Sequence, residues 1–144
     1  MADTPADLRG PYFPVTVDAT VWAEEVERLT ATSEARRAAQ TARQTLEAKG
    51  IARGLLAQCE AEASDGTRLA GCLKARVPLG RSASSEAPFG FVFRPAAHAD
   101  GGLTLQVLAY GERHPKHQAT RSVYERAHKR VHGRYPDEER GRPA

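Results

Sequence analysis

The sequence predicts an α+β fold in which helices pack on a small, mostly antiparallel sheet. Up to a turn at residues 64–66, apolar residues recur at the three- and four-residue spacing of helices. After that turn they alternate with polar residues in three successive segments, and one more helical pattern follows. Because strands that cluster after helices favour an α+β fold over a doubly wound parallel sheet, we expect the element order β-α-α-β-β-β-α.

The first two expected elements are a short strand and a helix. Residues 12–17 alternate weakly, and Pro11 and Pro14 would confine such a strand to an edge of the sheet. Asp18 is a candidate N-cap, because its side chain can accept a hydrogen bond from the first turn of a helix. The apolar face of this helix would consist of Val21, Trp22, Val26 and Leu29.

A second helix is expected to begin after Thr32 or Ser33 and to end at Gly50. Either hydroxyl can act as N-cap, and a glycine just past the last helical residue is a common C-terminal signal. The stripe expected to face the sheet consists of Ala35, Ala38, Ala42 and Leu46.

The segment from residue 51 to the turn is ambiguous. Leu55, Leu56 and Cys59 have the spacing of one or two further helical turns. The sequence Ser-Asp-Gly at residues 64–66 then predicts the turn itself, because these residue types favour turns.

The first of the three strands is expected within residues 69–79. Side chains in a strand alternate between two faces, which places Lys74 and Arg76 together on one face. The opposite face would carry Leu73, Ala75, Val77 and Leu79.

Residues 89–94 and 103–110 predict the other two strands. A hairpin turn at residues 99–102 should join them, and residues 80–88 read as a polar loop. These two strands would complete the sheet.

The last predicted element is a helix over residues 120–132, which follows a loop at residues 111–118. Pro136 should end the helical region, and residues 137–144 read as a polar tail. Residues 1–136 would then form a single domain. The apolar stripe of this helix consists of Val123, Ala127 and Val131.

Charge is distributed unevenly along the chain. Residues 1–66 contain 7 Lys or Arg and 11 Asp or Glu, a net charge of −4, whereas residues 67–144 contain 14 and 7, a net charge of +7. A basic surface suits a polyanionic partner such as a nucleic acid, because contacts to phosphate supply most of the non-specific affinity. A solvated basic surface without a partner is the alternative.

No feature of the sequence predicts export or membrane insertion. The first ten residues carry charges and no apolar core, unlike a signal peptide. No apolar run approaches the ~20 residues that span a bilayer. Cys59 and Cys72 are too few for a disulfide framework. We therefore expect free thiols, no membrane partner and a location in the cytoplasm.

Four segments within residues 67–132 carry a resemblance to a known family. A strand with basic residues is followed by an aromatic strand, an aliphatic strand that ends in Gly-x-Arg and a Val-Tyr-x-x-Ala helix. In this order the chain resembles the RelE/ParE toxins of toxin-antitoxin pairs, whereas over residues 12–60 only the element order agrees. The segments are RLAGCLKARVPLG, FGFVFR, LTLQVLAYGER and SVYERAHKRV.

The resemblance implies a small α+β toxin that an antitoxin protein holds inactive. RelE-like members cleave mRNA on the ribosome: the ribose 2′-OH attacks the adjacent phosphate, and basic residues supply the positive charge without a metal or other cofactor. ParE-like members instead inhibit DNA gyrase and cleave nothing.

The resemblance assigns roles to four residues. Lys74 and Arg76 match the basic pair of the first of the three strands. Arg113 matches the Gly-x-Arg arginine, which would stabilise the transition-state phosphate. Tyr124 matches the helix tyrosine, which would stack on a base or assist proton transfer.

Two histidines after Arg113 are candidates for the general base. His114 and His117 have the residue type whose unperturbed pKa of ~6.5 suits that role, although two exposed loop histidines are the alternative. Further contacts to RNA are expected from Arg81, Arg94, Lys116, Arg121, Lys129 and Arg130.

Gly90 departs from the family pattern. It stands at or near a position where ribonuclease members commonly carry an arginine, and Arg76 stands where lysine is frequent. Arginine can clamp a phosphate but is a poor base, since its pKa exceeds ~12. Arg81 or Arg94 would have to compensate for Gly90.

No metal site is expected. His114 and His117, and likewise His128 and His132, have a plausible ligand spacing, but no Cys-x-x-Cys pair or acidic cluster accompanies them.

Three functions remain open from the sequence. The first is a ribosome-dependent endoribonuclease toxin, favoured by Lys74, Arg113 and Tyr124 together. The second is a ParE-like gyrase inhibitor, favoured by Gly90 and by loops longer than is usual in the family. The third is a catalytically degenerate RelE-fold protein that serves as a binding or interaction subunit.

Overall fold

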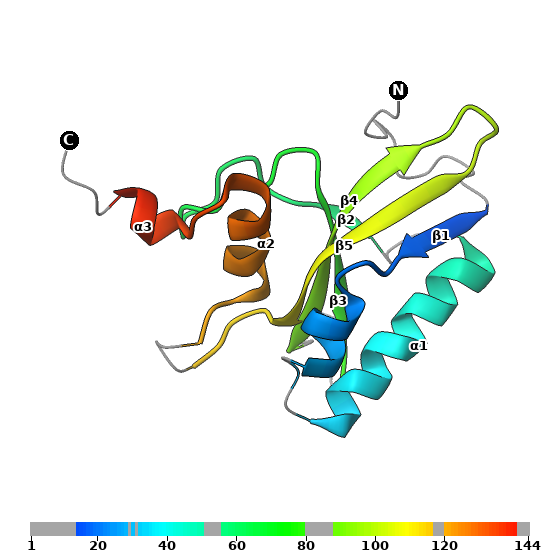
Figure 1. Ribbon diagram of the computed structural model, residues 1–144, viewed down its shortest axis with the longest axis horizontal. Coiled ribbons are helices and arrows are strands. Elements are labelled where there is room, and N and C mark those ends of the chain that lie inside the picture. Colours follow the sequence, from blue (N-terminus) through cyan, green and yellow to red (C-terminus); the bar gives the residue numbers. More distant parts are fainter. Residues whose placement is uncertain are drawn as a thin grey trace.

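The computed structural model describes residues 14–28, 30, 32–50, 56–79, 88–116 and 120–140. These residues form an α+β fold around one five-stranded sheet (Figure 1). In chain order the elements are β1 (Val15–Asp18), η1 (Ala23–Arg28), α1 (Ser33–Lys49), β2 (Ala57–Gln58), β3 (Leu73–Val77), β4 (Phe89–Ala97), β5 (Leu103–Glu112), α2 (Val123–His132) and α3 (Pro136–Arg140).

The sheet is mixed, with the strand order β1-β5-β4-β3-β2. β1 runs parallel to β5, and the other three pairings are antiparallel. The predicted α+β class and mostly antiparallel sheet are therefore confirmed. β1 lies at an edge, as its neighbouring prolines predicted.

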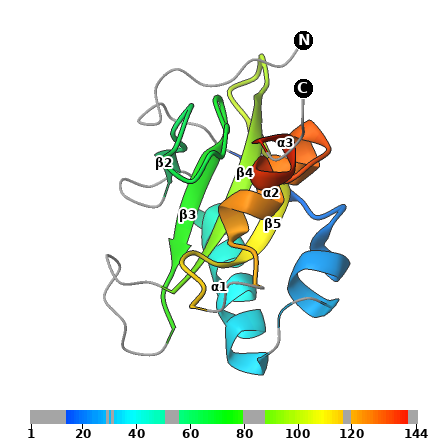
Figure 2. The ribbon, with the colours of Figure 1, turned by 90° about the vertical axis from the view of Figure 1, so that its left-hand side faces the viewer.

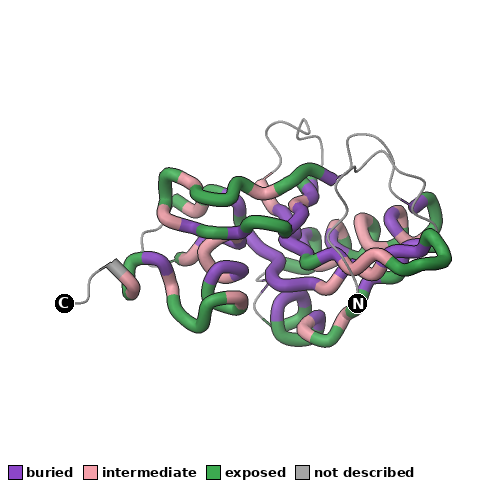
Figure 3. Tube along the Cα trace, turned by 90° about the horizontal axis from the view of Figure 1, so that it is seen from above, coloured by how far each residue is buried: buried purple, intermediate pink, exposed green. Residues whose placement is uncertain are grey.

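Helices cover both faces of the sheet. α1 and η1 pack on one face and α2 packs on the other, so that the sheet lies between them (Figure 2). The buried residues accordingly run along the strands and the inner sides of the helices (Figure 3). On the α1 face, the ring of Phe91 lies 4.5 Å from that of Tyr110 and 5.8 Å from that of Trp22, between ring centroids.

The predicted boundaries of α1 are confirmed. The Thr32 hydroxyl accepts a hydrogen bond from the backbone N–H of Ala35 at 3.2 Å, which satisfies one of the free donors of the first turn. Gly50 follows the helix with a φ of 69°, a conformation that favours glycine, and donates to the Leu46 carbonyl.

The helix predicted after Asp18 is present as the π-helix η1, but Asp18 ends β1 instead of capping a helix. Leu29, the last residue of the predicted apolar face, lies outside the described residues. The Asp18 carboxylate accepts from the backbone and hydroxyl of Thr20, an alternative that the same short side chain allows. Trp22 and Val26 are buried in the core as expected.

The expected helical turn near Leu56 and Cys59 is wrong for the described residues. Residues 57–58 form the short strand β2, which pairs with β3. Cys59 continues this pairing, because its backbone N–H donates to the Cys72 carbonyl at 3.0 Å. β2 is therefore an addition to the predicted element order.

The polar tail expected after Pro136 is also wrong for its first four residues. Pro136 begins the helix α3, a position where its missing N–H costs no hydrogen bond. Glu139 forms an ion pair with Arg68, and Asp137 forms one with Arg121. Residues 137–140 therefore belong to the fold.

A bulge in β5 places two consecutive side chains of this strand on the same face of the sheet. Val92 pairs with Ala109 but Phe93 pairs with Val107, which leaves Leu108 as an extra residue. Leu108 and Ala109 consequently both join the apolar cluster beneath α2.

Beyond the end of β1, side chains form hydrogen bonds with the backbone groups at the edge of β5. β1 reaches only Gln106, so the backbone of the following residues needs other partners. The Tyr110 N–H donates to Glu25 Oε1 at 3.0 Å, and the Tyr110 carbonyl accepts from Arg126 Nη2. Arg130 Nε donates to the Leu108 carbonyl at 2.7 Å.

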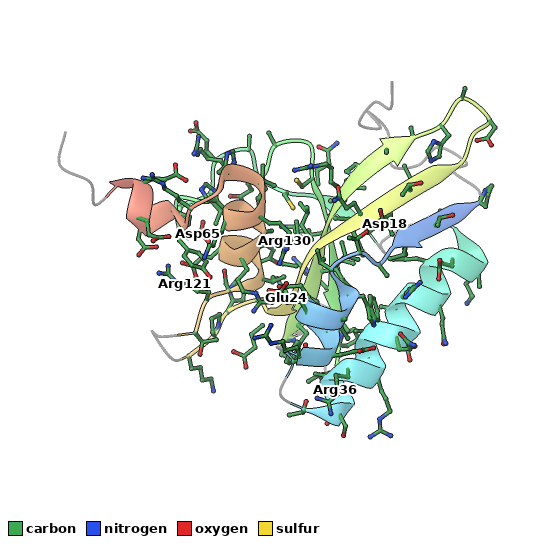
Figure 4. All side chains as sticks on the ribbon, in the orientation of Figure 1. Asp18, Glu24, Arg36, Asp65, Arg121 and Arg130 are labelled. Atoms are coloured by element: carbon green, nitrogen blue, oxygen red, sulfur yellow. The ribbon has the colours of Figure 1, made fainter. Side chains whose placement is uncertain are left out.

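The two arginines also pair with Glu25. Its carboxylate accepts from Arg126 at 2.8 Å and from Arg130 at 3.1 Å, and its side chain is only 2% exposed. Figure 4 shows Arg130 between α2 and the sheet, near the η1 turn that carries Glu24. Glu25 thus joins η1, β5 and α2.

We expect Ser122→Ala to lower the free energy of unfolding by about 1 kcal/mol, because it removes the cap of α2. The Ser122 hydroxyl accepts from the Glu125 N–H, and the Glu125 carboxylate accepts from the Ser122 N–H, both at 3.0 Å. Urea denaturation would measure the loss. Ser122→Thr, which keeps the hydroxyl, should recover most of it; equal losses in both variants would contradict the capping role.

No helix in the described part of the chain is long and apolar enough to cross a membrane.

Candidate functional site

A cavity of about 300 Å³ lies between β3, α2 and the segment that joins β2 to β3. It contains four of the residues that the sequence marked as catalytic, from separate parts of the chain. The described residues that line it are Cys59, Glu60, Ala63, Ser64, Asp65, Thr67, Leu69, Lys74, Arg113, His114 and Tyr124.

Lys74 reaches this cavity because β3 alternates. Leu73 and Ala75 point into the core on the α1 face, so Lys74 points to the face that α2 partly covers. Its Nζ lies 5.8 Å from the centroid of the Tyr124 ring, within the range of a cation–π contact. The strand thus places a flexible cation beside an aromatic ring.

Arg113 follows β5 directly and is 92% buried (8% exposed). Its Nε donates to the Tyr124 hydroxyl at 3.0 Å, and its backbone N–H donates to the Pro88 carbonyl at 2.8 Å. The guanidinium is therefore held in one orientation at the cavity. A fixed arginine fork suits an oxyanion such as phosphate.

Gly90 makes room for Arg113. A Cβ on Gly90 would lie 3.1 Å from Arg113 Cγ and 3.1 Å from the Ala75 carbonyl oxygen. Gly90 pairs across the sheet with Gly111, where a Cβ would lie 2.7 Å from Arg126 Nη2. Two paired glycines thus form a floor on which two arginine side chains lie. The departure that the sequence showed at Gly90 has this steric reason.

His114 lines the cavity and is exposed, whereas His117 lies outside the described residues. Arg76 shares the strand face of Lys74, as predicted, but is exposed and does not line this cavity. It stands beside a different, apolar groove between α1 and β3. The structure therefore separates the two members of the predicted basic pair.

Of the residues expected to make further contacts to RNA, those that the structure describes do not line the cavity. Arg81 lies outside the described residues, and Lys116 and Arg94 are exposed outside the cavity. Arg94 is close enough to Cys72 for its charge to lower the pKa of that thiol, although burial raises the pKa more strongly.

The residues of the RNA-binding set that lie in α2 or just before it have protein partners. Arg121 pairs with Asp137 and Glu125, and its guanidinium lies 4.0 Å from the centroid of the Tyr135 ring. The hydrogen bond to Asp137 raises the pKa of Arg121 above its usual value. Lys129 lies 4.5 Å from the same ring centroid. With Arg130 bound to Glu25, these side chains have structural contacts that their sequence pattern did not indicate.

The far wall of the cavity was missed from the sequence. It consists of the turn after β2, where Glu60, Ser64 and Asp65 face the basic side. Figure 4 shows Asp65 on the flank of α2. The predicted turn at residues 64–66 is confirmed, and Gly66 takes a φ of 89°. No local pattern showed that this turn would meet α2.

Two histidines of α2 hold that wall in place. The Arg68 N–H donates to His128 Nδ1 at 2.9 Å, and His132 Nε2–H donates to the Arg68 carbonyl at 2.8 Å. Because Nδ1 accepts, His128 carries its proton on Nε2 and donates it to Glu139 at 2.5 Å. The histidine pair whose spacing suggested ligands therefore has a structural role. No group of three metal-ligating side chains occurs among the residues that the structure describes.

We expect Glu139 to make stability fall in acid. Its hydrogen bond from His128, followed by the charge of Arg68, lowers the pKa of Glu139 below its ordinary value of 4.5. A lowered folded-state pKa stabilises the protein above the unfolded-state pKa, and this contribution is lost as the pH falls through the lowered value. The difference in unfolding free energy between wild type and Glu139→Gln should therefore be largest near pH 7 and shrink below pH 4.5. Urea titrations at several pH values measure it; a difference independent of pH would contradict the pairing.

Cys59 is a poor candidate for a nucleophile. Burial, and then the neighbouring Cys72 thiol, raise its pKa to about 12, against the smaller opposing effect of Lys74. A thiol with such a pKa stays protonated near neutral pH, and only the thiolate is reactive. Both cysteines are free, as expected.

The arrangement can bind and polarise a phosphate. Lys74 and Arg113 bring two cations to one cavity, Tyr124 adds a hydroxyl, and His114 adds an imidazole, the group most often used for proton transfer in catalysis. Comparison with family models, with curated proteins and with solved structures finds no match to the chain.

Proposed function

We propose that the protein is the toxin of a toxin-antitoxin pair and a ribosome-dependent endoribonuclease of the RelE type. The observation that carries this proposal is the meeting of Lys74, Arg113 and Tyr124 in one cavity. Lys74 lies in β3, Arg113 follows β5 and Tyr124 lies in α2, and the motif resemblance selects all three. The α+β class, with helices packed on a mostly antiparallel sheet, adds support.

The chemistry proposed is transphosphorylation of RNA. The ribose 2′-oxygen forms a bond to the adjacent phosphorus, the bond from phosphorus to the 5′-oxygen breaks, and a 2′,3′-cyclic phosphate results. One proton leaves the 2′-OH and another reaches the departing 5′-oxygen. Arg113 and Lys74 stabilise the negative charge on the phosphorane oxygens.

The general base is proposed to be His114 or Tyr124. The Tyr124 hydroxyl accepts a hydrogen bond from Arg113 Nε, which holds it in place at the cavity. His114 lies at the same cavity, and imidazole is the side-chain group most often used for proton transfer in catalysis. No described contact favours Arg76 in a catalytic role.

A non-catalytic ParE-like inhibitor of DNA gyrase is the second candidate. The observation that favours it is the separation of Arg76 from the cavity, which leaves fewer cations there than the resemblance implies. A catalytically degenerate RelE-fold binding protein would have the same basis. An antitoxin partner and a cytoplasmic location belong to the proposal in every case where the protein is a toxin.

Primer extension on cellular mRNA after brief induced expression tests the proposal. New 5′ ends in phase with codons are expected from wild type and should vanish in Arg113→Ala. Arg37→Ala, which alters an exposed arginine of α1 outside the cavity, is the matched control and should still cut. Growth arrest without new 5′ ends would contradict the ribonuclease proposal and favour inhibition of DNA gyrase. Neither cuts nor arrest would overturn the toxin proposal.

A further inference from the structure

The two walls of the cavity carry opposite charges. Lys74 and Arg113 stand on the sheet side, and Glu60 and Asp65 stand on the turn after β2. Within the part of the chain that the structure describes, neither Glu60 nor Lys74 takes part in an ion pair. A ligand that carries both an anion and hydrogen-bond donors would satisfy both walls.

The two acids of the turn are not equivalent. Asp65 Oδ1 accepts from the backbone N–H of Thr67 at 2.9 Å and from its hydroxyl at 2.7 Å, so Asp65 shapes the turn. Glu60 makes no hydrogen bond with the described residues and is exposed at the cavity. Its carboxylate is therefore the acceptor that remains for a ligand.

We infer that the cavity binds a guanine nucleotide of RNA, with the phosphate against Lys74 and Arg113 and the base edge against Glu60. This inference rests on the proposed function and adds the identity of the base. An ionised carboxylate only accepts hydrogen bonds, through two oxygens. Guanine is the RNA base with two adjacent donors, N1–H and the N2 amino group, on its pairing edge.

The other bases fit a carboxylate less well for a chemical reason. Adenine and cytosine place a ring-nitrogen lone pair beside the amino group, and uracil flanks its single N–H with two carbonyl oxygens. Each would direct a lone pair at the carboxylate, which a charged acceptor repels. The cavity volume of about 300 Å³ lies at the lower end of the range for small-molecule sites, which suits one nucleotide.

Backbone contacts at both ends of the wall that carries Glu60 indicate that the site is preformed. The wall that carries Glu60 is fixed at its far end, because His128 and His132 bind the backbone of Arg68. At its near end, the N–H of Cys59 pairs with the Cys72 carbonyl. The wall is thus tied at one end to α2, which carries Tyr124, and at the other end to the residue before β3, which carries Lys74.

Calorimetric titration of the full chain with guanosine 3′-monophosphate and adenosine 3′-monophosphate tests this inference. Wild type should bind the guanosine form roughly tenfold more tightly, since a hydrogen bond to a charged group contributes at least that factor. Glu60→Ala should bring the two affinities within roughly twofold of each other. Glu62→Ala, an exposed neighbour outside the cavity, is the matched control and should keep the preference.

Lys74→Met should weaken the binding of both nucleotides by the same factor, because Lys74 is proposed to contact the phosphate that both carry. Equal affinities in wild type, or a guanosine preference that survives Glu60→Ala, would overturn the inference. If the protein cuts no mRNA but its preference for guanosine depends on Glu60, the proposed ribonuclease activity is wrong and the proposed guanine site is supported. If the protein cuts mRNA but Glu60→Ala leaves the nucleotide preference unchanged, the ribonuclease proposal is supported and only the inference that Glu60 recognises guanine is wrong.

Discussion

Glu25→Ala is expected to lower the free energy of unfolding by about 3–5 kcal/mol, the usual cost of removing one partner from a buried ion pair. The carboxylate is 2% exposed and binds Arg126 and Arg130, whose side chains are 19% and 32% exposed. It also accepts the Tyr110 N–H at the edge of β5. The substitution would leave the Tyr110 N–H without its acceptor and would remove the carboxylate that both guanidinium groups pair with, and each such loss costs stability.

Urea denaturation followed by circular dichroism measures this loss. Glu24→Ala is the matched control, because Glu24 is the preceding residue of η1 and is exposed. Its effect should stay within about 0.5 kcal/mol. Glu25→Gln should lie between the two, since the amide oxygen can still accept the Tyr110 N–H but carries no charge. If Glu25→Ala costs no more than Glu24→Ala, the network does not stabilise the fold as proposed.

The elements that the sequence predicted well are those with local signals. Thr32 and Gly50 mark the ends of α1 through contacts within the same helix. The alternation of Leu73 to Val77 identified β3 and the face of Lys74 because each residue's side follows from its neighbours. The hairpin between β4 and β5 was likewise visible from Asp100 and the glycines that follow it.

The failures share a different physical cause. Glu25 was not expected to be buried, because its partners Tyr110, Arg126 and Arg130 lie 85 to 105 residues away in sequence. The wall that carries Glu60 depends on a contact between Arg68 and His128, 60 residues apart. Such contacts have no periodicity that a sequence can display.

Pro136 was misread for a more general reason. Proline stops a helix that precedes it, but it also suits the first turn of a new helix. The sequence favoured the first meaning, whereas the structure shows the second. The contacts of Asp137 and Glu139 decide between them, and both involve residues outside the helix.

The candidate site divides in the same way. The motif resemblance selected Lys74, Arg113 and Tyr124, and residue type selected His114 after Arg113. The structure brings these four residues together. Arg76 was selected with Lys74 because the two share a strand face, and that placement is confirmed. A shared face does not decide which residue a neighbouring helix and turn enclose, so only Lys74 reaches the cavity.

Lys74→Met is expected to reduce the rate of RNA cleavage by about 10²–10³, the usual effect of removing one preorganised group that stabilises transition-state charge. Methionine resembles the unbranched apolar stem of lysine but lacks its terminal ammonium, so contact with the Tyr124 ring can persist without the charge. Arg76→Met is the matched control on the same strand face and should reduce the rate less than about threefold, since Arg76 lies outside the cavity. Single-turnover cleavage of mRNA on purified ribosomes measures both rates.

The ratio of these two effects separates a site-specific role from a general attraction to RNA. If the cations act only through the overall basic charge of this half of the chain, both substitutions remove one charge and should weaken activity equally, with a strong dependence on salt. If Lys74 stabilises the phosphorane, its loss should lower the maximal rate at saturating ribosome concentration, which added substrate cannot restore. A large loss in Lys74→Met beside a small one in Arg76→Met would therefore assign the chemistry to the cavity. Equal losses would leave the cavity without a catalytic role.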